Sequence, residues 1–260
     1  MTLPPRDDAD TGSQPATGPV GDEGPAGLGG ADVPPAPPEI GVGDDGRRLG
    51  WPELVTAAVA YVVIQLGAGL LLVSATGALP PAPVLLGVSA VSALGAVAIA
   101  LGMRVRSRAA LGLRRVAWRT VGLAVGLGVA VWLASRVLII VYISITGDQT
   151  DPQAGLTQFS GGLSAVLVVV LGGLVVPLGE ELLFRGIGFG SLRRYGVVLA
   201  TIVSSLLFAL AHGLNVVFLA VLVLAVVNAL LYERTRSVWP CFVAHATFNL
   251  CSFGVLLAVL

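Results

Sequence analysis

The sequence predicts an all-α membrane protein, a bundle of about seven transmembrane helices behind a polar N-terminal tail. Hydrophobic residues make up 55% of the 260 residues and charged residues only 12%, about half the ~25% of a soluble domain. The mean hydropathy is +0.90. The formal net charge is +0 and no basic cluster lies on a polar face, which argues against soluble α/β enzymes and nucleic-acid-binding proteins.

Residues 1–50 form a tail that differs in composition from the rest of the chain. They contain nine of the sixteen prolines and nine of the fifteen acidic residues, and they have no apolar run. Such a segment buries too little apolar surface to offset its chain entropy. We therefore expect residues 1–50 to be a disordered, acidic, Pro/Gly-rich cytoplasmic tail.

The chain after Trp51 is a series of apolar stretches. Crossing the hydrocarbon core takes about 20 apolar residues, and only helices or closed barrels satisfy the backbone in lipid. The fourth stretch is too long for one bilayer, so we expect it to protrude, tilt or break. The boundary between the fifth and the sixth, at Gly213, is the least marked. The predicted spans are 54–76, 82–102, 120–145, 162–192, 197–213, 214–231 and 238–259, with 51–159 forming an N-terminal group of transmembrane helices.

The arginines predict how these spans are oriented. Connections rich in arginine alternate along the chain with connections that are uncharged or acidic. By the positive-inside rule, this alternation places the N-terminus in the cytoplasm and the C-terminus outside a plasma (inner) membrane. The arginine-bearing connections are 47–48, 104–119, 193–194 and 234–236.

Ionisable and amide side chains interrupt three of the apolar stretches. An ionisable residue inside a membrane span is a functional candidate by default, because burying it in lipid is costly. The chain's two histidines both lie in such stretches. We expect structural roles for Asn215 and Asn228. The candidate site residues are Glu180, Glu181, Arg185, His212, His245 and Asn249.

The depth of these side chains in the membrane predicts which of them meet. Glu180 lies fourteen residues before Arg194 and His212 eighteen after it. The difference is about 6 Å of helix rise, so Glu180 and His212 can face one another across antiparallel helices. His245 lies only seven residues after Val238 and is expected to be shallower. Two (i, i+4) relations add support, since Glu181 with Arg185 suits an ion pair, and His245 shares a helix face with Asn249.

A buried carboxylate beside a neutral imidazole suggests proton chemistry, in which Glu180 and His212 activate a water molecule that attacks an amide carbonyl. His245 and Asn249 would then donate hydrogen bonds to the oxyanion. Three alternatives stay open. The side chains could form a hydrogen-bond network that joins the helices, they could serve a transporter, or Glu180, His212 and His245 could bind zinc. No H-E-x-x-H motif is present, and we expect no cofactor.

The spacing of these residues resembles a known family. E-E-x-x-x-R (Glu180, Glu181, Arg185), F-x-x-x-H (Phe208, His212) and H-x-x-x-N (His245, Asn249) occur in that order on three apolar stretches. They are similar to the three signatures of the CPBP family, the CAAX-protease and bacteriocin-processing intramembrane glutamic endopeptidases, which include the Rce1-like type II CAAX prenyl endopeptidases. The resemblance covers roughly residues 160–252, so 160–260 is expected to be the catalytic core.

The resemblance implies an intramembrane endopeptidase. Glu180 and His212 would be the water-activating pair, His245 and Asn249 the oxyanion site, Glu181 and Arg185 the supporting pair, and Phe208 a packing residue. It favours a metal-free mechanism and a membrane-associated peptide or protein substrate that is prenylated in some members. It also keeps open a non-catalytic, bacteriocin-immunity-type protein that uses the same side chains for binding.

Overall fold

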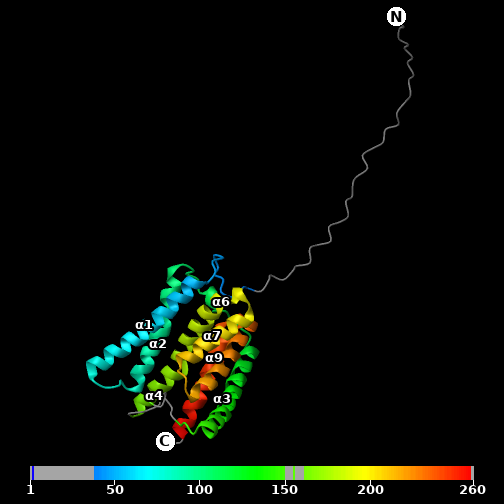
Figure 1. Cartoon of the computed structure of the whole chain (residues 1–260). Helices are drawn as coiled ribbons and strands as arrows, with labels where there is room; N and C mark the ends of the chain where they lie inside the picture. Colours follow the sequence, from blue (N-terminus) through cyan, green and yellow to red (C-terminus); the bar gives the residue numbers. More distant parts are fainter. Residues whose placement is uncertain (1, 3–37, 150–154, 156–160, 259–260) are drawn as a thin grey trace. The chain divides into compact units, whose positions relative to one another are not determined.

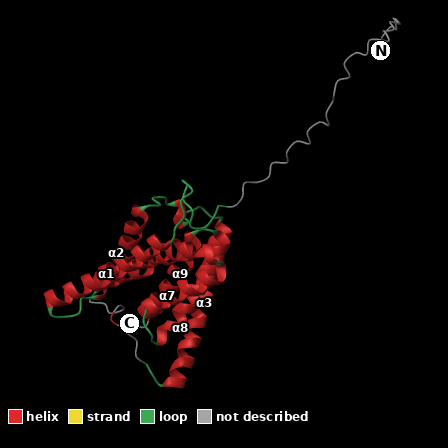
Figure 2. Cartoon of the chain, turned by 45° about the horizontal axis from the view of Figure 1, so that its top comes forward, coloured by secondary structure: helices red, strands yellow, loops and turns green. Residues whose placement is uncertain are grey.

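The computed structural model describes residues 2, 38–149, 155 and 161–258, and everything below refers to them. Within these residues all long elements are helices and no strand is formed; the only extended pairing is an isolated bridge between Val42 and Arg48. The predicted all-α class is confirmed. Figures 1 and 2 show the helices side by side, with the α1–α2 hairpin at one edge and α3 at the opposite edge.

The first two helices, α1 (Trp51–Thr76) and α2 (Ala82–Met103), form an antiparallel hairpin. A proline lies in the first turn of each, where its missing N–H removes no helical hydrogen bond. The carboxylate of Glu53, fully buried, accepts hydrogen bonds from the Gly50 amide at 2.8 Å and from Arg104 Nε at 2.9 Å. This contact joins the start of α1 to the end of α2.

A short 3₁₀ turn, Ala109–Leu111, leads to the long helix α3 (Trp118–Thr146), which packs on α8 and α9. Gly128 lies at the contact with α9, where a Cβ atom would be 2.5 Å from the Ala244 carbonyl oxygen. Small residues let helix backbones approach closely in membranes. Because Ala244 precedes His245, Gly128 sets the distance of α3 from the part of α9 that carries this histidine.

We expect Gly128→Val to destabilise the bundle. The added isopropyl group has no room, and overpacking typically costs about 1–3 kcal/mol. Gly126 in the same helix is the matched control, because a Cβ there would meet nothing within 4 Å. The free energy of unfolding, measured for both variants by denaturant titration in micelles, should fall for Gly128→Val only. Equal losses in the two variants would contradict this packing.

Residues 162–195 form one continuous helical run whose winding changes several times. Two segments have π-helical hydrogen bonding, and a 3₁₀ turn ends the run. The predicted break of this overlong stretch therefore takes the form of wider turns instead of a loop. Its parts are α4 (Gly162–Val170), η3 (Leu171–Val175), α5 (Val176–Glu181), η4 (Leu182–Phe189), α6 (Gly190–Leu192) and η5 (Arg193–Tyr195).

Three helices complete the bundle: α7 (Val197–Ala211), α8 (Val216–Thr235) and α9 (Val238–Ala258). The turn between α7 and α8 contains Gly213 at φ +87°, so the predicted boundary at this glycine is confirmed. Six helical stretches are long and apolar enough to cross a membrane, and α7, with 15 residues, is shorter. The chain is thus a multi-pass membrane protein, with a seventh apolar helix below the length of a full span.

The folded part begins earlier in the chain than the sequence predicts. Most of the predicted tail, residues 1 and 3–37, lies outside the described residues, but residues 38–50 form ordered turns in the same unit as the helices. Leu49 is buried, and Gly41 at φ +74° packs against the Gly190 carbonyl, where a Cβ would be 2.6 Å away. Residues 38–50 therefore pack with the helices, because this apolar residue and this glycine fit the helix surface.

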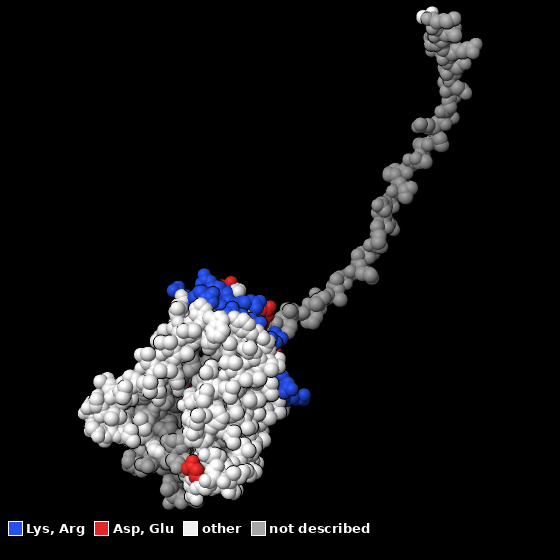
Figure 3. All heavy atoms as spheres, in the orientation of Figure 1, with Lys and Arg blue, Asp and Glu red and all other residues white. Residues whose placement is uncertain are grey.

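Most of the visible arginines gather at one end of the helical unit (Figure 3). They come from the segment before α1, the α2–α3 connection, the end of η5 and the end of α8. The apolar sides of the helices are exposed, including Leu70, Leu71 and Ile140. An apolar belt below a basic end is the pattern of a bundle that lies in a bilayer.

Candidate active site

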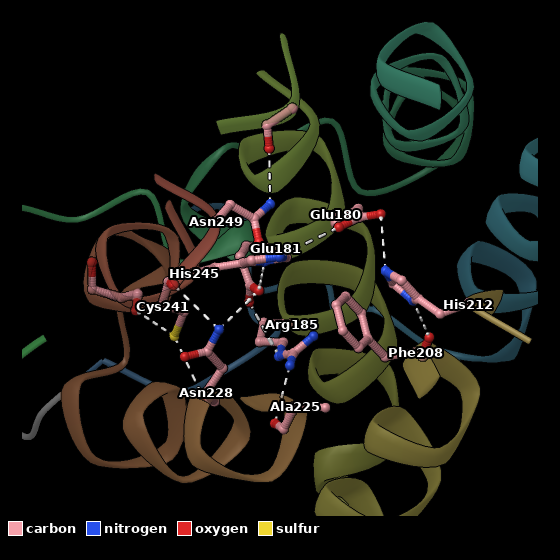
Figure 4. Close-up of polar contacts among 12 residues, drawn as sticks. Glu180, Glu181, Arg185, Phe208, His212, Ala225, Asn228, Cys241, His245 and Asn249 are labelled. Atoms are coloured by element: carbon pink, nitrogen blue, oxygen red, sulfur yellow. Dashed lines mark hydrogen bonds and ion pairs between the residues drawn. The ribbon is translucent and has the colours of Figure 1, made fainter. Parts of the chain in front are cut away.

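The polar side chains predicted from the sequence meet inside the bundle. Glu180 and Glu181 end α5, Arg185 follows in η4, His212 directly follows α7, and His245 and Asn249 lie in α9. Glu180, Glu181, Arg185 and His245 are buried. Figure 4 shows the two histidines on opposite sides of Glu180.

Glu180 lies between the two imidazole rings. Its Oε1 is 4.0 Å from His212 Nε2, and its Oε2 is 3.7 Å from His245 Nε2. Both distances exceed those of a direct hydrogen bond and are compatible with one water molecule that contacts both partners. The carboxylate and the two ring nitrogens therefore surround a small polar site in an otherwise apolar bundle.

The orientation of His212 is fixed by the helix that precedes it. Its Nδ1 lies 2.9 Å from the Phe208 carbonyl oxygen, which can only accept, so Nδ1 carries the proton in the neutral ring. The lone pair then resides on Nε2 and points to Glu180. Asn215 caps α8 by accepting from the Val217 amide and donates to the His212 carbonyl, both at 2.8 Å. Asn215 thus has the structural role that the sequence predicts.

Glu181 is the centre of a second, fully buried set of contacts. Its Oε1 accepts from His245 Nδ1 at 2.8 Å and from Asn228 Nδ2 at 2.9 Å, and its Oε2 is 3.2 Å from Arg185 Nε. The bond to Nδ1 holds the His245 ring with Nε2 directed at Glu180. The two neighbouring carboxylates therefore differ in their surroundings. Glu180 faces the histidines, whereas Glu181 accepts two hydrogen bonds and forms an ion pair with Arg185.

Arg185 and Phe208 pack against one another beneath this network. Arg185 donates to the Ala225 carbonyl at 3.0 Å, and its guanidinium lies 4.8 Å from the centre of the Phe208 ring. The same ring contacts His212 at 4.7 Å and His245 at 5.6 Å between centroids. Phe208 has the packing role expected of it and touches both imidazoles. An arginine above an aromatic face is a favourable cation–π arrangement.

Asn249 is bound to the backbone of η3. Its Nδ2 donates to the Gly172 carbonyl at 2.8 Å, which occupies one of its two amide hydrogens. Pro177 explains why this carbonyl is available, because proline has no N–H to donate to the residue four or five positions before it. The π-helical turns of η3 precede this proline, as is common where the helical ladder is interrupted.

Two glycines in η3 allow α9 to come this close. A Cβ at Gly172 would lie 2.7 Å from Phe253, and one at Gly173 would lie 2.7 Å from Leu250. A Cβ at either position would displace the end of one of these side chains, which belong to the helix that carries His245 and Asn249. The pair belongs to the functional residues that the sequence interpretation missed, although two adjacent glycines shortly before Pro177 and the acidic pair are a visible signal.

Asn228 is the other residue whose place was not predicted. In addition to Glu181, its Nδ2 donates to the Cys241 carbonyl at 3.2 Å, and the Cys241 thiol donates to the Asn228 carbonyl at 3.2 Å. Asn228 thus connects α8 to α9 and to the acidic pair. The sequence did not predict this role, because Asn228 forms no recognisable motif with another residue of α8.

His245 lies deeper than the sequence predicts. We expected a position nearer the surface, seven residues after the start of its span, but its ring reaches Glu180. Ser237 and Val238 are themselves buried, so α9 starts below the surface of the bundle. The wide turns of η4 also shorten the rise between the arginine-rich end and Glu180. Among the residues that the structure describes, no three His, Cys, Asp or Glu side chains are arranged to share a metal ion.

Comparison with known proteins supports a family for this part of the chain. Residues 162–251 match the family model described as "Type II CAAX prenyl endopeptidase Rce1-like". The chain is 33% identical over 108 residues to "UPF0177 protein YxdF" of Lactococcus lactis subsp. lactis (strain IL1403). It is 31% identical over 84 residues to "Putative membrane peptidase YdiL" of Bacillus subtilis (strain 168).

These similarities are partial. They cover 41% of this chain and 57% of YxdF, and 32% of this chain and 34% of YdiL. No solved structure gives a significant match. The region that matches the family model contains all six predicted site residues. Residues 162–251 therefore resemble the Rce1-like type II CAAX prenyl endopeptidases, as the sequence motifs indicate.

Proposed function

We propose that this protein is an intramembrane endopeptidase in which Glu180 and His212 activate the water molecule that hydrolyses a peptide bond. The observation that carries the proposal is the Glu180 carboxylate between two imidazole nitrogens, 4.0 and 3.7 Å away, inside an apolar bundle. A general base must reach the proton that it removes directly or through one water. These distances suit a water held between the carboxylate and His212.

In the proposed reaction, Glu180 takes a proton from this water while the oxygen of the water attacks the carbonyl carbon of the substrate. The carbonyl π electrons move to oxygen and give a tetrahedral oxyanion. When the oxyanion collapses, the C–N bond breaks, and the proton held by Glu180 passes to the leaving amine. The products are a carboxylic acid, which keeps the second proton of the water, and an amine, and Glu180 returns to its starting state. No Ser or Cys nucleophile is required.

The position of His245 supports it as a donor to the oxyanion. Its Nε2 is directed toward Glu180, 3.7 Å from Oε2. Glu181 holds the other ring nitrogen at 2.8 Å. Asn249 offers the amide hydrogen that Gly172 does not use. One such donor contributes about 3–4 kcal/mol to the barrier.

The substrate in this proposal is a membrane-embedded peptide or protein, prenylated or not, and no cofactor takes part. We further propose that the arginine-rich end faces the cytoplasm of the plasma (inner) membrane, so that the N-terminus is cytoplasmic and the C-terminus external. A fluorogenic farnesylated peptide ending in a CaaX sequence is a suitable first probe. Comparison of membrane peptides in cells carrying wild type or Glu180→Gln would reveal unprenylated substrates.

Asn249→Ala separates a protease from a transporter or an immunity-type binding protein. With the purified protein in vesicles after dialysis against a chelator, we expect kcat for the peptide probe to fall about 10²–10³-fold, as for the loss of an oxyanion donor. Ser252→Ala, one turn further along α9, is the control, because its hydroxyl bonds only locally to the Phe248 carbonyl. It should leave kcat unchanged.

Asn249→Ala also removes the bond to Gly172, so the folded fraction of the variant is measured in the same preparation. A merely structural role would lower the amount of folded enzyme without changing kcat per folded molecule. An unchanged kcat would remove Asn249 from the oxyanion site. Absence of any cleavage by the wild type, together with binding or transport that Glu180→Gln alters, would favour the non-catalytic alternative. Activity that zinc restores after chelation would favour the zinc protease.

A further inference from the structure

A cavity of about 250 Å³ opens at the arginine-rich end, away from the candidate active site. Its walls come from three parts of the chain: the ordered segment before α1, the η5 turn, and the end of α8. Four arginines and two glutamates supply its charged lining, so positive charge exceeds negative charge. These are Glu39, Arg48, Arg193, Arg194, Glu233 and Arg236.

Two of the arginines are held in place by the glutamates. Arg193 makes a two-pronged contact with Glu233, with Nε–Oε2 at 2.6 Å and Nη2–Oε1 at 2.7 Å. Arg48 pairs with Glu39 at 2.5 Å. Arg236 donates to the Pro38 carbonyl at 2.7 Å. The guanidinium groups are thus oriented before any ligand arrives, which lowers the entropy that binding would cost.

Arg194 brings charge that neither glutamate balances. Its guanidinium lies 4.8 Å from the centre of the Tyr195 ring and against Gly50, where a Cβ would be 3.5 Å from Nη1. In the described part of the chain it has no carboxylate partner. Packing on an aromatic face holds the guanidinium without using its N–H donors, and guanidinium geometry matches phosphate oxygens.

The cavity lies at the depth where lipid headgroups are found. Trp51 Nε1 donates to Tyr195 Oη at 2.8 Å beside Arg194, and both rings are about half exposed, at 52% and 49%. Tryptophan and tyrosine concentrate at the membrane–water interface, with their apolar parts in the bilayer and their polar atoms at headgroup level. A ligand in this cavity would therefore be in register with the phosphates of the surrounding leaflet.

We propose that this cavity binds the phosphate group of an anionic lipid headgroup, with Arg194 as the principal contact. Basic pockets between transmembrane helices bind such headgroups, and polybasic surfaces gain from each added arginine near an anionic leaflet. The occupant would join the segment 38–50 to the end of the helical run that also carries Glu180 and Arg185. The proposal is independent of the peptidase chemistry, because none of its residues belongs to that site.

The test uses the full chain and native mass spectrometry, with phosphatidylglycerol, zwitterionic phosphatidylcholine and inorganic phosphate as separate probes. Wild type should retain one phosphatidylglycerol in preference to phosphatidylcholine. Arg194→Gln should weaken that binding about fivefold. The matched control is Arg119→Gln, because Arg119 is exposed near the start of α3 and lies outside the cavity. The affinity of this variant for phosphatidylglycerol should stay within about twofold of the wild-type affinity. If Arg194→Gln does not fold, Arg194→Lys takes its place. It keeps the positive charge but not the planar guanidinium group, so it should lose less affinity for phosphatidylglycerol.

The outcomes separate the sources of the phosphate. Competition by inorganic phosphate that depends on Arg194 would support the phosphate site and extend it to soluble ligands. Preference for the lipid without such competition would support a headgroup site alone. Equal weakening by Arg194→Gln and Arg119→Gln would mean that phosphatidylglycerol is attracted by the general basic surface, and unchanged binding in both would mean that the cavity does not bind it. Either result would overturn the proposal.

Discussion

Glu180→Gln is expected to reduce peptide cleavage by about 10³-fold or more while the protein still folds. The amide has nearly the size of the carboxyl group and remains polar between His212 and His245, but it cannot take a proton from water. Loss of a general base typically costs 10²–10⁴-fold in rate. The measurement is kcat for the fluorogenic peptide in vesicles, together with the unfolding transition of each variant.

The control for this change is Asp45→Asn, an acidic residue at the surface of the segment before α1, with its side chain 46% exposed. It removes the same charge far from the site and should leave kcat within about twofold. His212→Ala should approach the Glu180→Gln rate, because both side chains act on one water. Retained turnover in both site variants would remove the proposed mechanism.

Arg185→Met is expected to cause the largest loss of stability. The guanidinium is fully buried, lies 3.2 Å from Glu181 and donates to the Ala225 carbonyl. Its removal leaves two neighbouring buried carboxylates with one fewer positive charge. Breaking a buried ion pair in this way costs about 3–5 kcal/mol. The free energy of unfolding, measured by denaturant titration in mixed micelles, should fall by that amount.

Two further variants show whether the pair itself is responsible. Arg119→Met changes an exposed arginine and should alter the free energy of unfolding by less than about 0.5 kcal/mol. Combining Arg185→Met with Glu181→Gln should recover part of the loss, since the unpaired charge is then also removed. A loss below about 1 kcal/mol in Arg185→Met, or no recovery in the double variant, would contradict a stabilising ion pair.

The sequence was sufficient to predict the helices because apolar length is a direct physical requirement of a bilayer. Six stretches meet that requirement, and their ends fall close to the predicted ones. The overlong stretch was recognised, but its wide turns were not, since π-helical winding depends on which carbonyls Pro177 leaves free and on which groups donate to them. Residues 38–50 look polar and glycine-rich, and their packing depends on a surface formed by distant parts of the chain.

The site could be predicted as far as helix spacing determines it. Glu180 and His212 lie in one hairpin, so their depths follow from counting residues. His245 lies in a helix whose start is buried, and counting from the apparent end of the span gave too shallow a position. The Asn249–Gly172 and Asn228–Glu181 hydrogen bonds join helices that are far apart in the sequence, so no local sequence pattern predicts them.

The central claim is that water, activated by Glu180, is the nucleophile. It is tested most directly by a single turnover in H₂¹⁸O with enzyme in excess over the peptide, followed by mass spectrometry of the product and of the enzyme fragment that contains Glu180. The account predicts one ¹⁸O atom in the new C-terminal carboxylate and none in Glu180. Label in the side chain of Glu180, or an unlabelled product, would instead indicate that the carboxylate attacks the substrate itself and would contradict the account.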